Sequence, residues 1–386
     1  MVDGFAVSRA AASDREEILG LWDEVILRGR FGADWAGIDS HIFGTGSPDS
    51  AEHVLVARDT SNPGRICATV AAIPMTMLIE GLPVGAIAIT GVATRPEYQR
   101  RGLMARLLEE AFDSLDATER PLTVLWGYRD RYRRFGFEIC GARTTQFVPR
   151  RKFSGPSPDD VAAVRELRVP EDAAIIDEYG VPANLVLDGH PGHLDRVYGR
   201  ALQRTCVYEG PRGRALATVP AAAADAAETL EVLHVVGDAE AAAALLEVLM
   251  ADGDYGECAV RQPPLASGPL GEYVHMLGEW FRIEHICNLR INDLAALMSA
   301  LGPRIDERLA RAGLRLSVRM SRGDREQMWE SGGEGLAVAL DLEDHRLVRV
   351  LFGPERPSDL PLVPPVGQVL DAVLPLRFDV TPLEGL

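Results

Sequence analysis

The stretch that decides the fold runs from Val92 to Met104 and reads VATRPEYQRRGLM. An apolar run typical of a strand precedes it, and Pro96 ends that run. The residues at 101–115, RGLMARLLEEAFDSL, then place apolar side chains at helical intervals. The sequence therefore predicts that a strand ends, the chain turns and a helix begins, so unpaired backbone amides and the positive end of a helix meet near Gly102.

This turn has the features of a pyrophosphate site. Gly102 has no Cβ and allows the backbone to approach a phosphate closely, and Arg100 and Arg101 add positive charge. Adjacent arginines beside a glycine stand out in a chain whose formal charge is −17. The alternative is an arginine-rich helix end that is exposed to solvent and binds nothing.

Length and composition indicate an ordinary folded protein. The 386 residues predict two to three domains, and 47% hydrophobic and 25% charged residues exclude a disordered or collagen-like chain. The excess of acidic residues, 57 against 40 basic ones, disfavours binding to nucleic acids or anionic membranes and favours a cationic partner.

Other features limit the cellular context. The five cysteines are far apart and form no C-x-x-C pair, so neither a disulfide framework nor a zinc site is expected, and no metal is predicted elsewhere. The N-terminus does not resemble a secretory signal, and no apolar stretch reaches the roughly 18 residues of a membrane span. We expect a cytoplasmic protein.

Three domains are expected, at residues 1–150, 151–289 and 290–386. The first boundary follows from the turn-forming stretch SGPSPDD at 154–160. The second domain repeats the order of strand, glycine turn and helix at 229–253, but carries GDAE at 237–240 in place of the arginines. Two carboxylates there should repel a pyrophosphate. The last domain is expected to be a small α+β module that includes a hairpin over 335–353.

The motif at 92–104 resembles the acetyl-CoA-binding motif of the GNAT N-acetyltransferases. Together with YRRFGF at 132–137, the match is most similar to the Eis (enhanced intracellular survival) branch, the aminoglycoside acetyltransferases, and covers about residues 85–140. The resemblance implies an α/β (α+β) fold class: tandem GNAT folds, the N-terminal one active and the central one degenerate and without a CoA site, followed by a domain like sterol carrier protein 2 (SCP2).

The resemblance also assigns the cofactor-binding residues. Strand backbone would contact the pantetheine arm, the turn and helix start would hold the pyrophosphate, and the end of the next strand would flank the cofactor. In that order, these residues are Val92, Ala93 and Thr94; Arg100, Arg101, Gly102, Leu103, Met104 and Ala105; and Gly127 and Tyr128.

Two catalytic groups follow from the same resemblance. Tyr132 would be the general acid, since a phenol, with a pKa near 10, can protonate the departing CoA thiolate. The alternatives are a merely structural aromatic on a helix, or Tyr128 or Tyr98 in its place. The free α-carboxylate of Leu386 would be the base and would also attract a cationic amine. The alternative is a disordered C-terminal tail.

The predicted function is an acetyl-CoA-dependent N-acetyltransferase that acts on a small cationic amine: an aminoglycoside, a polyamine or a lysine-like group. Two alternative functions stay open: a non-catalytic acyl-CoA-binding or assembly module, and a GNAT-fold enzyme that uses another acyl chain. The resemblance further implies a homo-oligomer, a hexamer in Eis-like proteins.

Overall fold

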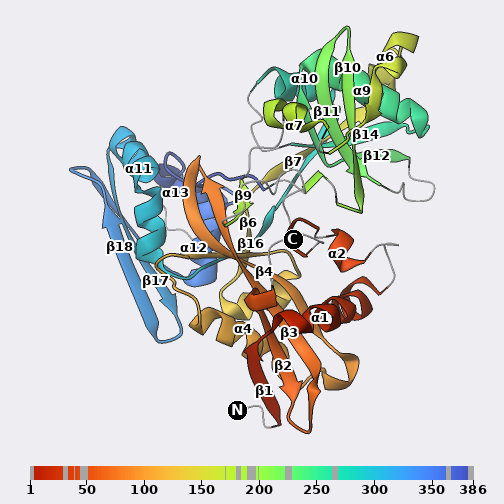
Figure 1. Cartoon of the computed structure of the whole chain (residues 1–386). Coiled ribbons are helices and arrows are strands. Elements are labelled where there is room, and N and C mark those ends of the chain that lie inside the picture. The colour runs from red at the N-terminus through yellow and green to blue at the C-terminus, as the bar shows by residue number, and fades with distance from the viewer. Residues whose placement is uncertain are drawn as a thin grey trace.

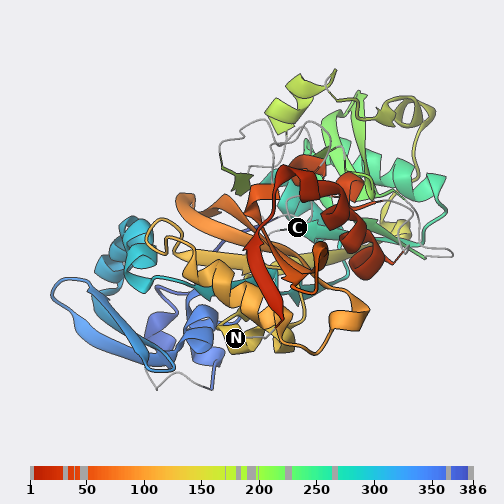
Figure 2. The same cartoon turned by 60° about the horizontal axis from the view of Figure 1, so that its bottom comes forward.

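An eight-stranded sheet forms the middle of the molecule and lies between the central part of the chain, coloured green, and the C-terminal part, coloured blue (Figures 1 and 2). The structure is a computed structural model. It describes residues 4–28, 34–38, 40–43, 51–169, 171–179, 184–188, 197–198, 200–221, 228–262, 268–361 and 367–380.

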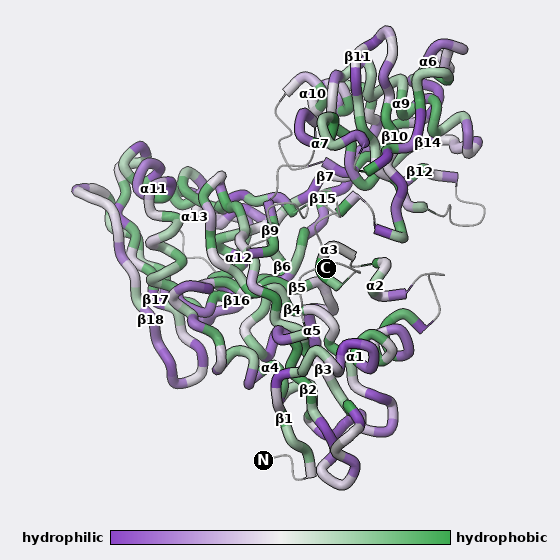
Figure 3. Tube along the Cα trace, in the orientation of Figure 1, coloured by the Kyte–Doolittle hydropathy of each residue, from purple (hydrophilic) through white to green (hydrophobic). Residues whose placement is uncertain are grey.

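The large sheet has the strand order β1-β2-β3-β4-β5-β16-β6, with β9 added to β3. Neighbouring strands are antiparallel except β4 and β5, which are parallel. The strands are β1 (Phe5–Arg9), β2 (Val54–Asp59), β3 (Asn62–Ile79), β4 (Leu82–Thr94), β5 (Leu122–Leu125), β6 (Glu138–Cys140), β9 (Leu185–Leu187) and β16 (Cys287–Ile291). In Figure 3, β4 and β5 carry much of the hydrophobic colour in this sheet.

Helix α4 (Leu103–Asp113) connects the two parallel strands and covers one face of the sheet, against β2, β3 and β4. Its buried residues, Leu103, Leu107, Leu108 and Ala111, follow the predicted helical spacing. The short helices of this part are η1 (Ala12–Asp14), α1 (Arg15–Trp22), η2 (Asp23–Leu27), α2 (Trp35–Ile38), α3 (Ser40–Phe43), η3 (Ala51–His53), η4 (Pro96–Tyr98), α5 (Arg129–Tyr132), η5 (Arg133–Phe135) and η6 (Arg150–Lys152).

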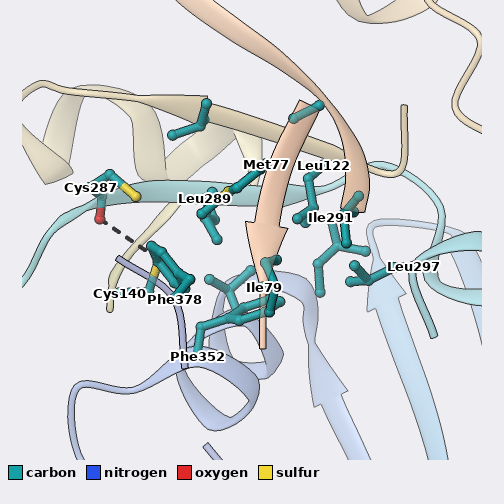
Figure 4. Packing of buried hydrophobic residues seen from close by; sticks show 14 of the residues in the cluster. Met77, Ile79, Leu122, Cys140, Cys287, Leu289, Ile291, Leu297, Phe352 and Phe378 are labelled. Atoms are coloured by element: carbon teal, nitrogen blue, oxygen red, sulfur yellow. Dashed lines mark hydrogen bonds between the residues drawn. The ribbon is translucent and has the colours of Figure 1, made fainter. Parts of the chain in front are cut away.

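The opposite face of the sheet is covered by α1 and by the C-terminal module, which share one hydrophobic core. Figure 4 shows where β3, β5 and β16 of the sheet meet the module, with Met77, Leu122 and Leu289 packed near Leu297 and Phe352. Cys140 and Cys287 are buried there as free thiols, as the sequence predicts for small hydrophobic residues.

The central unit has two four-stranded sheets. One has the order β13-β11-β10-β8 and the other β12-β14-β7-β15. Helix α9 (Ala239–Asp252) lies between β13 and β14 in the chain, as α4 lies between β4 and β5. The other elements are β7 (Arg143–Pro149), β8 (Val164–Glu166), β10 (Gln203–Gly210), β11 (Gly213–Pro220), β12 (Thr229–Val232), β13 (His234–Gly237), β14 (Glu257–Gln262), β15 (Trp280–Glu284), α6 (Pro158–Ala162), α7 (Ala173–Tyr179) and α10 (Pro269–Leu277).

The C-terminal module is a three-stranded sheet, β18-β17-β19, packed with α11 and α12. The hairpin predicted over 335–353 is wrong: only its first half is a strand, and the second half is α12, whose apolar side chains are buried. The elements are α11 (Leu294–Ala312), β17 (Leu314–Arg322), β18 (Arg325–Ser331), β19 (Leu336–Glu343), α12 (Asp344–Phe352), η7 (Pro357–Asp359) and α13 (Gly367–Leu370).

Strand pairing crosses both of the domain boundaries proposed from the sequence. β7 precedes the boundary at 150, yet it pairs with β14 and β15 of the central unit. β16 spans the boundary at 289 and pairs with β5 and β6 of the large sheet. β9 lies between α7 and β10 in the chain, yet it pairs with β3 of the large sheet. The chain therefore crosses between the first two units at β7, on both sides of β9, and between β15 and β16. Among the helices described, none combines the length and hydropathy needed to cross a membrane.

Candidate active site

The turn between β4 and α4 has an unusual backbone. Arg100 and Gly102 both adopt left-handed conformations, with φ values of 62° and 77°. Gly102 is the residue at the N-terminal cap of α4. Alternation of left-handed and right-handed residues turns successive N–H groups towards one side, a geometry that forms anion-binding concavities.

The amides of this turn are free to bind a ligand. Arg106 donates its backbone amide to the carbonyl of Gly102 at 3.1 Å. Between Gln99 and Arg106, no backbone amide donates to a backbone carbonyl of the described residues. The amides of residues 100–105 therefore have no backbone acceptor. They coincide with the stretch that the sequence predicts for the pyrophosphate.

The two arginines of the turn differ, which the sequence could not reveal. The guanidinium of Arg101 lies over the ring of Tyr98 at 5.3 Å and over that of Phe5 at 5.9 Å, and donates to the carbonyl of Glu97 at 3.3 Å. Arg100 is exposed, and no ion pair or hydrogen bond of its side chain is found among the described residues. Arg100 is therefore the arginine free to reach a phosphate, whereas Arg101 stabilises the turn.

The edge of β4 next to this turn lacks a strand partner on one side. β4 pairs with β5 only as far as Ile89, which faces Leu125. Beyond that point β4 continues to Thr94 while β5 has ended, so the two parallel strands part. Val92, Ala93 and Thr94 lie on this unpaired edge, where an extended amide-containing chain could add to the sheet.

Tyr132 lies on the α4 face of the sheet, beside the end of β5. It is 5% exposed and shares a hydrophobic cluster with Leu103 of α4 and Leu125 of β5. An added Cβ at Gly127 would lie 2.8 Å from the ring of Tyr132, so glycine is needed there for the ring to fit. Tyr132 and the anion-binding turn therefore lie on the same face, at the point where β4 and β5 part.

Burial raises the pKa of the Tyr132 phenol above its ordinary value, and the neighbouring Arg131 partly opposes this shift. The phenol is therefore protonated at neutral pH, as a general acid must be.

Helix α5, which carries Tyr132, is anchored to β6 by a buried ion pair. Both oxygens of Glu138 accept hydrogen bonds from Arg129, one of them at 2.7 Å, and Glu138 is 2% exposed. This bond raises the pKa of the Arg129 guanidinium. The sequence predictions did not include this pair. Its only signal in the sequence is that Arg129 and Glu138, nine residues apart, flank the motif at 132–137.

The alternative tyrosines are placed elsewhere. Tyr128 is 78% exposed, with the guanidinium of Arg131 over its ring at 5.7 Å. Tyr98 packs edge-on against Phe5 of β1, with the guanidinium of Arg101 over its ring. Of the three, Tyr132 alone combines burial with a position at the end of β5.

The proposed base, Leu386, lies outside the described residues. The last described residue, Val380, is buried, and its carbonyl accepts a hydrogen bond from Arg143 at the start of β7. Next to it, burial raises the pKa of the Asp379 carboxyl, although Arg143 opposes the shift.

The corresponding turn of the central unit is built differently. Asp238 precedes α9, and its Oδ2 accepts a hydrogen bond from the amide of Arg214 at 2.9 Å. An added Cβ at Gly213 would lie only 2.2 Å from that oxygen. The carboxylate therefore lies against the hairpin between β10 and β11, at the N-terminal cap of α9, and Glu240 adds a second negative charge in the first turn of the helix.

Comparisons with known proteins agree with this geometry. A family model for the acetyltransferase (GNAT) domain matches residues 7–140. This match confirms the resemblance predicted from the motif at 92–104. No curated protein sequence gives a match.

Three solved structures are similar along nearly the whole chain. A GCN5-related N-acetyltransferase from Anabaena variabilis is 13% identical, with 99% of this chain and 100% of that chain covered and a TM-score of 0.65. One from Kribbella flavida is 16% identical, with 97% and 99% covered and a TM-score of 0.63. Eis1 from Mycobacterium abscessus is 17% identical, with 98% of both chains covered and a TM-score of 0.61. At these identities the similarity establishes the fold, and it confirms the predicted α/β class with tandem units.

Proposed function

We propose that this chain, whose residues 7–140 match the GNAT acetyltransferase domain and whose fold is similar to that of Eis1, is an acetyl-CoA-dependent N-acetyltransferase that acts on a cationic amine. One observation carries the proposal: six consecutive free amides, at 100–105, lie on the same face of the sheet as the buried phenol of Tyr132. The first feature suits a diphosphate, and the second suits a leaving thiolate.

The chain's residues have distinct roles in this reaction. Amides of the turn and the side chain of Arg100 hold the pyrophosphate, and the free edge of β4 at Val92–Thr94 receives the pantetheine amides. A deprotonated acceptor nitrogen attacks the thioester carbonyl, and backbone amides near Val92 stabilise the oxyanion of the tetrahedral intermediate. The C–S bond then breaks, and Tyr132 gives its proton to the departing thiolate.

The acceptor is proposed to be a cationic amine because the chain carries a formal charge of −17. Such a charge attracts a polycation and raises its rate of association. Aminoglycosides, polyamines and lysine side chains share this chemistry. Their ammonium groups must lose a proton before attack, so the reaction also needs a base.

We assign the base to the terminal carboxylate of Leu386. The support from the described residues is the position of Val380, which is fixed by its burial and by its bond to Arg143 beside the large sheet. Six more residues can span at most about 20 Å. Such a reach is compatible with a carboxylate that enters the space where β4 and β5 part.

Extending the chain by two residues beyond Leu386 should lower kcat for acetyl transfer by roughly 10-fold or more, because it moves the terminal carboxylate away from the acceptor nitrogen. The measurement is steady-state thiol release, with the same dipeptide added at the N-terminus as control. Full activity of the C-terminally extended enzyme would assign the base to a side chain or to water.

Two other readings of the site remain open to experiment. A binding module that has lost turnover would bind CoA without releasing thiol, and an enzyme for another acyl chain would prefer a different thioester. The intact Arg100, Arg101, Gly102 and buried Tyr132 favour a catalytic site over a module that has lost turnover.

Calorimetry and a thiol-release assay test the proposal together. We expect acetyl-CoA to bind with one site per chain, because Asp238 and Glu240 place two negative charges at the equivalent helix start of the central unit. We expect thiol release from acetyl-CoA to depend on an added polyamine or aminoglycoside. No heat of binding would reject the proposal, and binding without thiol release across an amine panel would favour the module.

Further assignments rest on the resemblance to the Eis family. We propose that the C-terminal module is like SCP2, that the chain forms a homo-oligomer, as a hexamer, and that it acts in the cytoplasm without metal, nucleic acid or membrane partners. The α+β order of α11, the sheet β17–β19 and α12 supports the first of these. The architecture does not imply lipid transport.

A further inference from the structure

The strand that would hold the thioester contains a bulge at Gly91. Thr69 of β3 pairs with Ala93 of β4, whereas Ala71, two residues further along β3, faces Thr90. Two residues of β4 therefore oppose one residue of β3. Gly91 adopts a left-handed conformation, with φ at 56°, as a glycine does in one common type of bulge.

The bulge lies just beyond the last residue of β4 that pairs with β5, Ile89. It changes the direction of β4 at the point where the strands part. The residues that follow, Val92 and Ala93, belong to the edge proposed to receive the pantetheine arm and to stabilise the oxyanion of the thioester carbonyl. Their orientation depends on the shape of this bulge.

Two buried side chains hold the bulge in place. The indole Nε1 of Trp22 donates to Thr69 Oγ1 at 2.8 Å, and Thr69 Oγ1 donates to the carbonyl of Gly91 at 2.8 Å. Trp22 and Thr69 are fully buried. An added Cβ at Gly91 would lie 2.2 Å from Trp22 Cζ2, so the indole also packs directly on the bulge. We call Trp22 and Thr69 the clamp.

Ring packing around Trp22 and a hydrogen bond from β3 to α1 hold the clamp in position. The ring of Trp22 packs against those of Phe43 and Trp35, with centroids 4.8 Å and 5.4 Å away. Helix α1 is also tied to the end of β3, because Glu17 accepts a hydrogen bond from the amide of Ile66 at 2.8 Å.

Arg95, directly after β4, completes this attachment. Its Nε donates to the carbonyl of Ile66 at 2.9 Å, and its Nη1 lies 2.7 Å from a carboxylate oxygen of Glu24. The clamp and the strand that it holds are therefore bonded to both α1 and η2.

We propose that the clamp is a positioning device for acetyl transfer: Trp22 and Thr69 fix the bulge at Gly91 so that the next amides point at the thioester carbonyl. The inference rests on the proposed function. Neither side chain contacts the reacting atoms. Loss of the hydroxyl of Thr69 removes the acceptor of the buried indole N–H and one donor to the carbonyl of Gly91, which frees the bulge to relax. A displacement of the order of 1 Å at such a site can cost about 10²-fold in rate.

Thr69→Val tests the clamp, because valine keeps the shape of threonine and removes the hydroxyl. We expect kcat to fall roughly 10- to 100-fold, while KM for acetyl-CoA and the affinity for CoA stay within about threefold, since the pyrophosphate turn is intact. Thr69→Ser, which restores the hydroxyl, should recover most of the rate.

Thr123→Val is the matched control. Thr123 is also fully buried in the large sheet, and its hydroxyl exchanges hydrogen bonds with the side chain of Asn292 at 2.9 and 3.1 Å. Both substitutions remove a buried hydroxyl and should lower thermal stability alike. Only Thr69→Val should lower kcat. Equal kcat values in the two variants would overturn the clamp, even if the wild type is confirmed as an acetyltransferase.

A second measurement does not require turnover. Exchange of the backbone amides in the β3–β4 pairs on either side of the bulge, Thr69 with Ala93 and Ala71 with Thr90, should accelerate at least 10-fold more in Thr69→Val than in Thr123→Val. Unchanged exchange at these amides would refute the positioning role, whether or not the chain transfers acetyl groups. Accelerated exchange in a protein without acetyltransferase activity would support the clamp and reject the proposed function, so the two failures are distinguishable.

Discussion

Tyr132→Phe should lower kcat for acetyl transfer by roughly 10²-fold or more and leave the dissociation constant of CoA unchanged within about twofold. A positioned general acid typically contributes 10²- to 10⁴-fold, and phenylalanine removes only the hydroxyl that gives its proton to the thiolate. The ring of Tyr132 packs against Gly127 and Phe137 through carbon atoms, so phenylalanine preserves this packing. The measurements are steady-state thiol release and calorimetry with CoA.

The pH dependence gives a second test of the same residue. Burial raises the pKa of Tyr132, so the protonated, acid form persists to a higher pH than in free tyrosine, whose pKa is about 10. Any loss of kcat between pH 8 and about 10 must then come from another group. The Tyr132→Phe profile should keep the shape of the wild-type profile over this range and lie below it.

Tyr208→Phe serves as the control. Tyr208 is fully buried in the central unit, and its hydroxyl donates to Asp160 at 2.8 Å. This variant also loses a buried hydroxyl and should lose some stability, but its kcat should match that of the wild type. A Tyr132→Phe enzyme as active as Tyr208→Phe would remove the phenol from the mechanism.

The parts of the site that were predictable are those specified by local sequence. The run at 92–104 combines a strand end, a proline and a glycine that tolerates a left-handed backbone, and a regular apolar spacing follows it. Each of these features acts on the backbone within a few residues. The structure has the turn and α4 where this pattern places them. The role of Tyr132 is assigned by the resemblance of the motif at 132–137, and it stays a prediction.

The hairpin predicted over 335–353 failed because short apolar runs are ambiguous. The segment after Glu343 contains Leu347, Val348, Val350 and Leu351, which suit either a strand or a helix. All four are buried against the large sheet and the strands of the module. That environment selects the helix and is absent from the local sequence.

Long-range pairing was the other limit. No local signal shows that β7 leaves the first unit for the central one, or that β16 returns to β5. The clamp is equally hidden, since Trp22 and Thr69 are 47 residues apart and meet only in the folded sheet. The adjacent arginines also look equivalent in sequence, although Arg101 is held by Tyr98 and Phe5.

Gly102→Ala should weaken CoA binding by roughly 10- to 100-fold. Gly102 adopts a φ of 77°, and in this conformation its amide belongs to the concave row of free donors at 100–105. A Cβ there both disfavours the left-handed backbone and occupies the space that a phosphate oxygen needs. Loss of one hydrogen bond to a charged group costs about 1.5–3 kcal/mol, which corresponds to the expected change in affinity.

Gly102→Ala could weaken binding through backbone strain alone. A substitution at a second left-handed glycine separates this effect from loss of the phosphate site. Gly81, in the turn between β3 and β4, has a φ of 78°, and nothing lies within 4 Å of an added Cβ. Gly81→Ala therefore imposes nearly the same strain at a distance from the turn at 100–105. The two variants should lose similar thermal stability, measured by calorimetric unfolding, but only Gly102→Ala should bind CoA weakly in titration calorimetry. If both bind CoA as the wild type does, the row of amides before α4 does not hold the diphosphate, and the assignment of this turn is wrong.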